Sequence, residues 1–446
     1  MRIWLKNPLA ILADDAAGGL VVEKSQILEI VPRGTKPQNS YDQVFDASDH
    51  VILPGLINTH HHFYQTLTRA CPSAINKELF PWLKALYPIW AGLNPENFRL
   101  AVRVALAELL LSGCTTAADH HYVYPEKLTD GLDIQVEEAK ALGMRIHLTR
   151  GSMNLSVADG GLPPQSVVQD KDTILADSES MVNKYHQHQE GAFIQVALAP
   201  CSPFSVTTDI MLETAELAEK LNVRLHTHLA ETEDENQFCL SKFGCRPVDY
   251  LENVGWMSDR TWLAHGIHFS DDEIQRLGQA GVAVAHCPSS NHILASGPCP
   301  VPALEAAGVP VGLAVDGSAS QDCSNLIQEI RQAFFLQRLG HGAANITHFD
   351  AYRWATAGSA ACLGRKDIGE IAVGKQADLA MFKLDELRFS GAGDPLAALI
   401  LCGAHRADRV MVGGKWAVVD GAIPGLDIAD LIRNHHSQAL TLQGIA

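Results

Sequence analysis

Helical and extended segments alternate along most of this chain, and this alternation is the feature that most limits its possible folds. Residues 94–96 (Asn-Pro-Glu) are typical of a helix N-terminus, and the helix that they open is expected to end at Gly113 before a short buried strand. The same order recurs in a helix at 212–221 and a strand at 223–228, a capping box at 270–273 and a strand at 282–286, and a helix at 302–307 and a strand at 310–315. Repeated helix-then-strand units with short connections predict a parallel sheet.

Closure of that sheet decides the fold class. Right-handed crossovers repeated this often favour an α/β fold of the (β/α)8 type, a TIM barrel, over an open sheet. A doubly wound open sheet is the alternative, but no glycine-rich phosphate loop follows the first expected strand. We therefore predict a barrel that spans residues 55–369.

The two ends of the chain have a different pattern. Residues 1–54 contain short β segments such as GGLVVEK and QILEIVP, and a β pattern returns in 370–446. The Gly413-Gly414 pair between two apolar runs indicates a hairpin. Because neither end alone could bury a core, we predict that both ends pair as a small β-sandwich domain.

Composition excludes several classes of partner. The net charge of −17 argues against a nucleic-acid backbone, which needs clustered Lys and Arg. No apolar run reaches the roughly 18 residues of a membrane span. The ten Cys show no CxxC pair, which is typical of reduced thiols and predicts a cytoplasmic protein. A homo-oligomer is compatible with the sequence.

Polar side chains of one chemical kind stand where expected strands end. They are His60, His62, His228, His265 and Asp316. His60 and His62 are one residue apart, so both imidazoles point to the same side of an extended strand. Side chains at the C-terminal ends of several parallel strands converge in a barrel, and imidazole and carboxylate groups are ligands that zinc prefers. The pattern predicts a metal site.

Several of these positions have a second interpretation. His226 has the same spacing to His228 as His60 has to His62, so either could reach the ion. Glu231 lies beside the ion if the chain turns after the strand, or else caps the next helix. Asp316 precedes Gly-Ser and could instead cap a helix, because Asp is a common N-cap residue. His61 should face away from the site.

The motifs PGLINTHHH, HTHLAET, AHGIH, HCPSSN and AVDGS resemble the amidohydrolase superfamily, in its aminohydrolase branch of deaminases and chlorohydrolases. The resemblance covers nearly the whole chain and includes IGEIAVGKQADLAMF, which is similar to that family's C-terminal sandwich segment. It implies that His60, His62, His228 and Asp316 hold one divalent metal ion, with Zn²⁺ expected. The fourth strand lacks the bridging lysine or glutamate of binuclear members.

The same resemblance implies the catalytic roles. Glu231 would move protons, and His265 and Asp316 would contact the reactive water. An ion in such a site lowers the pKa of water from about 15.7 to near 7, which supplies hydroxide at neutral pH. Hydrolytic deamination of an amino-substituted ring uses all these groups. Displacement of chloride from a triazine-type ring is the alternative, and a non-catalytic metal-binding protein is a third reading that retention of Glu231 and His265 disfavours.

The substrate is expected to be a small fused ring. Gln65 offers an acceptor and two donors, and a glutamine at the matching position of guanine deaminases implies a purine or pterin substrate. A solvent-facing amide is the other interpretation. The segment APCSPFS lacks the arginine that guanine deaminases carry there, which favours an oxidised purine over guanine.

Four further residues are candidates for substrate binding. Trp90 could stack on a flat heterocycle or belong to the core. His121 could line the rim, and Arg150 could reach a ring carbonyl or form an ion pair. Cys201 could contact the ring or serve as a small buried hydrophobe.

Overall fold

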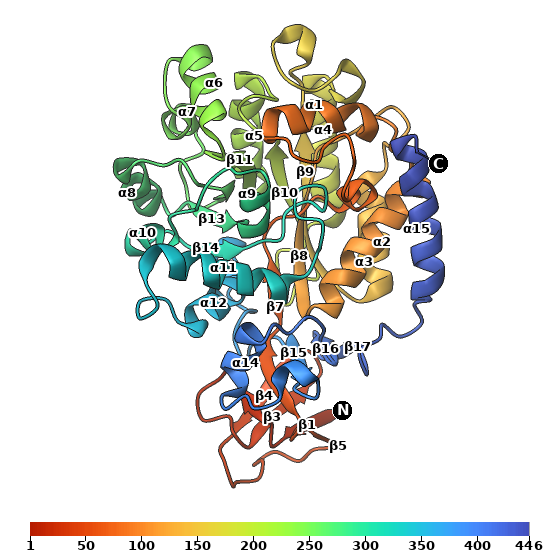
Figure 1. Cartoon of the computed structure of the whole chain (residues 1–446), viewed down its shortest axis with the longest axis vertical. Helices are drawn as coiled ribbons and strands as arrows, with labels where there is room; N and C mark the ends of the chain where they lie inside the picture. Colours follow the sequence, from red (N-terminus) through yellow and green to blue (C-terminus); the bar gives the residue numbers. More distant parts are fainter. Residues whose placement is uncertain (446) are drawn as a thin grey trace.

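The computed structural model describes residues 1–445, and its centre is a sheet of eight parallel strands that neighbour one another in chain order. Thr59 N donates to Leu313 O and Asp316 N donates to His60 O, each over 3.1 Å, which connects the last strand to the first. This nearly closed ring confirms the predicted (β/α)8 barrel (Figure 1). Its strands are β7 (Leu56–Asn58), β8 (Cys114–His121), β9 (Arg145–Ser152), β10 (Ile194–Pro200), β11 (Leu225–Leu229), β12 (Thr261–His265), β13 (Ala283–His286) and β14 (Val311–Leu313).

Helices connect the strands and surround the ring (Figure 1). They are α2 (Pro95–Leu111), α3 (Gly131–Leu142), α4 (Lys171–Tyr185), α5 (Thr208–Leu221), α6 (Glu233–Phe243), α7 (Pro247–Asn253), α8 (Asp271–Ala280), α9 (Pro288–Ile293), α10 (Val301–Ala306), α11 (Leu326–His341), α12 (His348–Ala355) and α13 (Ala357–Cys362). Both predicted helix starts are confirmed, because the Asn94 and Ser270 side chains accept from backbone N–H groups in the first turns of α2 and α8. Within residues 1–445, no helix combines the length and apolar character that a membrane span requires.

The two ends of the chain form two further sheets below the barrel (Figure 1). One sheet has the order β4 (Gln26–Val31), β3 (Gly19–Glu23), β1 (Arg2–Lys6), β5 (Gln43–Asp46), and the other has the order β17 (Lys415–Val418), β16 (Arg409–Val412), β15 (Leu379–Lys383), β6 (His50–Pro54), β2 (Ala10–Ile11). The hairpin expected at Gly413-Gly414 joins β16 to β17. Apolar side chains from both sheets share one core, which includes Leu5, Val22, Leu379 and Met411.

Two helices lie apart from this repeating pattern. α15 (Ile428–Gln443) lies along α2 on the barrel, although residues 370–446 were expected to belong to the sandwich (Figure 1). Its His435 and Gln443 side chains form hydrogen bonds with Thr66 and with the Leu67 carbonyl, at 3.1 and 2.7 Å, in the short helix η1 (Phe63–Thr68). α1 (Leu79–Trp90) lies above the opposite end of the barrel from the terminal sheets (Figure 1). The remaining short elements are the helices η2 (Val157–Asp159), η3 (Gln165–Val167), η4 (Leu387–Phe389) and α14 (Pro395–Leu401).

Candidate metal centre

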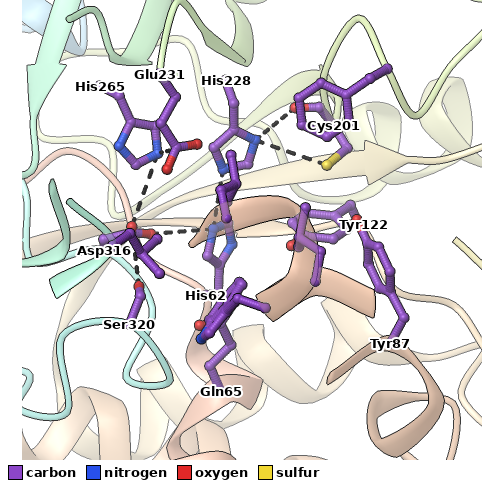
Figure 2. Close-up of a pocket in the computed structure, with 15 residues that line it drawn as sticks. His62, Gln65, Tyr87, Tyr122, Cys201, His228, Glu231, His265, Asp316 and Ser320 are labelled. Carbon is purple, nitrogen blue, oxygen red and sulfur yellow. Dashed lines mark hydrogen bonds and ion pairs between the residues drawn. The ribbon is translucent and has the colours of Figure 1, made fainter. Parts of the chain in front are cut away.

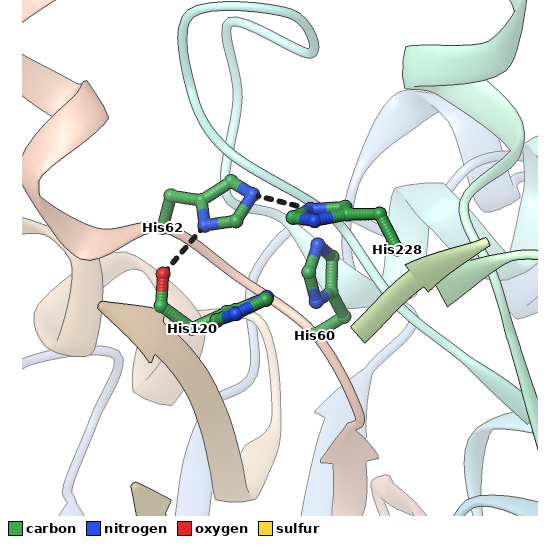
Figure 3. Close-up of side chains that lie close together, drawn as sticks. All are labelled: His60, His62, His120 and His228. Carbon is green, nitrogen blue, oxygen red and sulfur yellow. Dashed lines mark hydrogen bonds between the residues drawn. The ribbon is translucent and has the colours of Figure 1, made fainter. Parts of the chain in front are cut away.

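Three histidines and one aspartate from three different strand ends meet in the barrel. His60 and His62 follow β7, His228 is on β11, and Asp316 follows β14. His62 Nε2 lies 3.2 Å from His228 Nε2, and Asp316 Oδ1 lies 3.2 Å from His60 Nε2 and 3.3 Å from His62 Nε2. All four side chains are buried. The convergence expected for the carboxyl ends of barrel strands is present in the structure (Figures 2 and 3).

The outward hydrogen bonds of two histidines determine where each carries its lone pair. His62 Nδ1 lies 2.8 Å from the His120 carbonyl oxygen, and His228 Nδ1 lies 2.7 Å from the Cys201 carbonyl oxygen. A carbonyl oxygen only accepts, so each Nδ1 carries the proton. Burial lowers the pKa of both imidazoles, that of His228 to about 3, so neither ring holds a second proton. Both Nε2 atoms therefore present lone pairs to the centre.

His60 also presents an Nε2 lone pair to the centre, because its Nδ1 donates a hydrogen bond to another histidine. His226 Nδ1 lies 2.8 Å from the Trp262 carbonyl oxygen and must donate to it, so His226 Nε2 is an acceptor. That atom lies 2.7 Å from His60 Nδ1, which therefore donates. Burial lowers the pKa of His60 and His226 well below the usual value, so both rings are neutral. His60 Nε2 is left without a proton and forms no hydrogen bond within the described chain.

This arrangement fits a cation. Three unprotonated nitrogens and a carboxylate oxygen approach one another to 3.2–3.3 Å with no proton between them, which is unfavourable unless a positive charge lies at the centre. Imidazole nitrogen together with carboxylate oxygen is the ligand set of zinc and related divalent ions. The outward hydrogen bonds are those that orient metal ligands in proteins. The residues at this centre therefore fit one divalent metal ion.

The backbone at three strand ends is held in the left-handed region. Ala230, His265 and Asp316 have φ values of 54°, 73° and 63°, which non-glycine residues seldom adopt. Such conformations persist only where surrounding contacts hold them, and they cluster at functional sites. The Glu235 carboxylate accepts from the backbone N–H groups of Ala230 and Glu231, each over 3.0 Å. This contact fixes the turn that carries Glu231 into the centre.

Glu231 and His265 form an acid–base pair beside the three histidines. His265 Nε2 lies 3.4 Å from Glu231 Oε2 and 4.0 Å from Asp316 Oδ2, and its Nδ1 lies 3.0 Å from Asn291 Oδ1. Burial raises the pKa of Glu231 to about 7. Burial opposes a charged His265, but the Glu231 and Asp316 carboxylates hold its pKa above the usual value. These groups can exchange protons near neutral pH.

A small cavity of about 380 Å³ opens beside this group of residues (Figure 2). One wall consists of His62, His228, Glu231, His265 and Asp316. The rest of the lining is mostly apolar or aromatic, with a few polar groups, and consists of Gln65, Leu79, Trp82, Leu83, Tyr87, Tyr122, Cys201, Phe204, Leu294 and Ser320. An apolar cavity with a few converging polar groups is typical of a small-molecule site.

Residues 51–417 match the amidohydrolase family. The chain belongs to this family. An 8-oxoguanine deaminase from Pseudomonas aeruginosa is 63% identical over 444 residues, which are 99% of this chain and 99% of that protein. An isoxanthopterin deaminase from an unknown prokaryote is 37% identical and covers 87% of this chain and 85% of its own length. These matches confirm the predicted superfamily and its aminohydrolase branch.

A solved structure supports the same assignment of fold. The crystal structure of an atrazine chlorohydrolase from Arthrobacter aurescens, complexed with zinc, superposes with a TM-score of 0.92. It is 29% identical in sequence, and the alignment covers 98% of this chain and 99% of that one. The amidohydrolase fold of this chain therefore extends over the barrel and the terminal sheets alike.

Three predicted substrate-binding residues of this amidohydrolase lie outside the cavity lining. Trp90 is fully buried in the core, where its Nε1 donates to Thr68 Oγ1 over 3.2 Å. His121 faces outward from β8 and its ring centre lies 4.7 Å from that of Phe98. Arg150 forms an ion pair of 2.5 Å with Asp177. Trp90 thus belongs to the core and Arg150 to an ion pair, which are the alternative roles that the sequence allowed for them. His121 points away from the centre because of its position on β8. Gln65 and Cys201 do line the cavity.

His120 is the nearby histidine that sequence reasoning passed over in favour of His121. Its ligand nitrogen lies within 4.8 Å of those of His60, His62 and His228 (Figure 3), and its ring stacks on that of His228 at 4.8 Å. Its Nε2 donates to the Ala199 carbonyl over 2.9 Å. Alternation along β8 sends adjacent side chains to opposite faces, so only one of two neighbouring histidines can face the centre. Nothing in the residue types alone indicated which one.

Proposed function

We propose that this chain is a zinc-dependent hydrolase that converts 8-oxoguanine and water into urate and ammonia. The observation that carries the proposal is the 63% identity to an 8-oxoguanine deaminase over 99% of both chains. An isoxanthopterin deaminase is the second candidate, because a relative of that activity is 37% identical over 87% of this chain.

The lining of the cavity supports a free base as the substrate. Leu79, Phe204 and Leu294 close it with apolar side chains, which offer no partner for the hydroxyl groups of a ribose. A flat fused ring suits this space better than a nucleoside does.

The proposal assigns metal binding to His60, His62, His228 and Asp316. When bound there, a zinc ion supplies the Lewis acidity that activates water for attack on the ring. The observation that supports this assignment is that three Nε2 lone pairs and a carboxylate oxygen face one another in a buried space. The outward hydrogen bonds hold these atoms in place before an ion arrives.

The proton transfers are assigned to the pair beside the metal ligands. Asp316 and His265 orient the attacking water and accept its proton. Glu231 donates a proton to the ring nitrogen, regains one from the water by way of His265, whose Nε2 lies 3.4 Å from Glu231 Oε2, and then protonates the departing amine, so the group leaves as ammonia. Burial raises the pKa of Glu231 to about 7, which lets the carboxyl change its protonation state readily near neutral pH.

Gln65 and Cys201 are assigned to the ring. Gln65 Oε1 accepts from the Ala319 backbone N–H over 3.3 Å, which orients the amide with its NH₂ group as the remaining donor. Cys201 lies beside His228, with its Sγ 3.9 Å from His228 Nδ1. An amide donor suits an oxygen or ring nitrogen on the edge of a purine.

The test is ammonia release by the purified zinc protein from 8-oxoguanine, guanine, isoxanthopterin and adenosine, measured side by side. We expect 8-oxoguanine to have the highest kcat/KM and urate to be its product. Chloride release from a chlorotriazine serves as the control for displacement chemistry. A higher kcat/KM for isoxanthopterin would make isoxanthopterin, and not 8-oxoguanine, the preferred substrate. Chloride release without ammonia release from any base would overturn the proposal.

A further inference from the structure

α1 presents one face to the cavity. Leu79, Trp82, Leu83 and Tyr87 all line it, and their spacing of three or four residues places them on one side of the helix. Three of these side chains are apolar or form an internal hydrogen bond, since Trp82 Nε1 donates to the Ala319 carbonyl over 3.2 Å. Tyr87 is the member of this face whose polar group has no such role.

The Tyr87 hydroxyl is buried without a partner. The residue is 1% exposed, and its oxygen forms no hydrogen bond with any described part of the chain. Burial raises the pKa of this phenol well above its usual value, so the hydroxyl is a neutral donor. An unsatisfied buried hydroxyl is unfavourable, and a ligand that accepts its hydrogen bond would remove that cost. Tyr87 is also one of the residues that line the cavity.

The other hydroxyl groups of the lining differ from that of Tyr87. Ser320 Oγ accepts from Ser290 Oγ over 2.9 Å and lies 3.2 Å from the Gly317 carbonyl and 3.4 Å from Asp316 Oδ2. It is therefore occupied within the protein. Tyr122 lies between His62 and Tyr87 in Figure 2, closer to the metal ligands, with its ring centre 5.2 Å from that of His62. Tyr87 is thus the tyrosine of the lining that lies farther from the metal ligands, and its buried hydroxyl has no hydrogen-bond partner among the described residues.

The position of Tyr87 matches the chemistry of the proposed substrate. In Figure 2, Tyr87 lies across the cavity from Asp316, Ser320 and His265. The carbon that loses its amine must lie at the metal centre and Glu231, so the far end of a fused ring points toward Tyr87. In 8-oxoguanine that far end is the five-membered ring with its C8 carbonyl. Guanine has a C–H group in place of that carbonyl.

We propose that the Tyr87 hydroxyl donates a hydrogen bond to the C8 carbonyl oxygen of 8-oxoguanine and so makes α1 the element that selects the oxidised base over guanine. This inference rests on the proposed function and names a specificity-determining residue within it. A site built to hydrogen-bond one group discriminates against the analogue that lacks it, because its own polar group is then left unpaired.

The experiment compares wild type with Tyr87→Phe, which removes only the hydroxyl. We expect kcat/KM for 8-oxoguanine to fall by roughly 10- to 100-fold, while that for guanine changes by less than about threefold. Tyr124→Phe is the matched control, because Tyr124 also has a buried hydroxyl without a partner but does not line the cavity. It should leave the ratio of the two substrates unchanged.

Product inhibition gives a second measurement that does not depend on turnover of guanine. Urate retains the C8 carbonyl and xanthine lacks it, so the wild-type protein should bind urate more tightly and Tyr87→Phe should lose that difference. An unchanged substrate ratio, or an equal loss for both substrates, would overturn the role of Tyr87. Wild-type protein without activity on 8-oxoguanine would instead overturn the proposed function itself. Should Tyr87→Phe fail to fold, Tyr87→Leu takes its place in both measurements.

Discussion

At the residue scale, the direction in which each buried imidazole donates its proton determines whether the centre can bind a cation. His62 and His228 donate to backbone carbonyl oxygens, whereas His60 donates to the side chain of His226. A backbone acceptor cannot be removed by substitution. His226 is therefore the one outward support of the three proposed histidine ligands that mutation can test.

His226→Leu removes the acceptor of the His60 Nδ1 proton and frees that ring to rotate or change tautomer. We expect the affinity for Zn²⁺ to fall by roughly 10- to 100-fold, as measured on the metal-free protein by competition with a chromogenic chelator. His226→Gln retains an acceptor and should recover part of the loss. His121→Phe is the matched control, since this buried histidine faces away from the centre. An affinity equal to that of wild type would contradict the positioning role of His226.

Glu231→Gln tests the proton transfer independently of metal binding. The amide has nearly the same shape but cannot exchange protons at neutral pH, so we expect kcat to fall by at least about 100-fold. Metal content, measured by mass spectrometry, should stay near that of wild type, because Glu231 is assigned no place among the ligands. Retention of most of the wild-type rate would show that another group carries the proton.

At the scale of elements, the sequence predicted the ends of the barrel strands but not the elements above them. Strand ends and the period of two predicted that His60, His62 and Asp316 lie near the centre, because they restrict where a side chain can point. They left His226 and His228 open, and the choice of His228 rested on the family resemblance. Tyr87 could not be predicted, because its role depends on α1 folding back over the barrel from outside the repeating pattern. Contacts between elements that are distant in the chain leave no periodic signal.

The position of α9 also depends on a contact between elements that are distant in the chain, because a buried acid on α11 holds this helix in place. The Glu329 carboxylate of α11 accepts from Ser289 N and Ser289 Oγ, each over 2.7 Å. Two residues further along α9, Asn291 accepts from His265. Burial raises the pKa of Glu329 from its usual 4.5 to about 7. The orientation of His265 thus depends on a buried acid whose pKa is raised into the neutral range.

This shift predicts how stability depends on pH. A carboxyl group with a raised folded-state pKa stabilises the fold while protonated in both states, below about pH 4.5, and that contribution is lost as pH rises through about 7. Glu329→Gln removes the titration and keeps the acceptor for Ser289. Between pH 5 and pH 8, we expect the variant to gain up to roughly 3 kcal/mol over wild type in urea unfolding. Parallel pH profiles of the two proteins would contradict this account.

At the scale of the whole molecule, the site residues lie at the C-terminal ends of barrel strands, and the terminal sheets lie below the barrel (Figure 1). Sandwich formation by both ends of the chain was predictable, because each end had strands but no core of its own. The position of α15 was not, since its amphipathic pattern does not name the surface that it covers. The terminal sheets must still be joined to the barrel, and a buried ion pair does this.

That ion pair connects β9 to the segment before β15. Asp378 contacts Arg145 at 3.1 and 3.2 Å and also accepts from Gly413 N over 2.6 Å, and both charged residues are buried. Asp378→Ala leaves Arg145 buried without a counter-charge, so we expect a loss of about 3–5 kcal/mol in urea unfolding. Asp249→Ala, which breaks a more exposed ion pair with Arg276, should cost no more than about 1 kcal/mol.

The double variant Asp378→Leu/Arg145→Met tests whether the cost of Asp378→Ala comes from the unpaired charge of Arg145. If the cost of Asp378→Ala comes from the stranded charge of Arg145, removal of both charges should restore much of the stability. Because the pair lies at the end of the barrel away from the metal ligands, kcat/KM of the folded double variant at low temperature should stay near that of wild type. Loss of activity in a folded protein would mean that the terminal sheets also influence the geometry of the site.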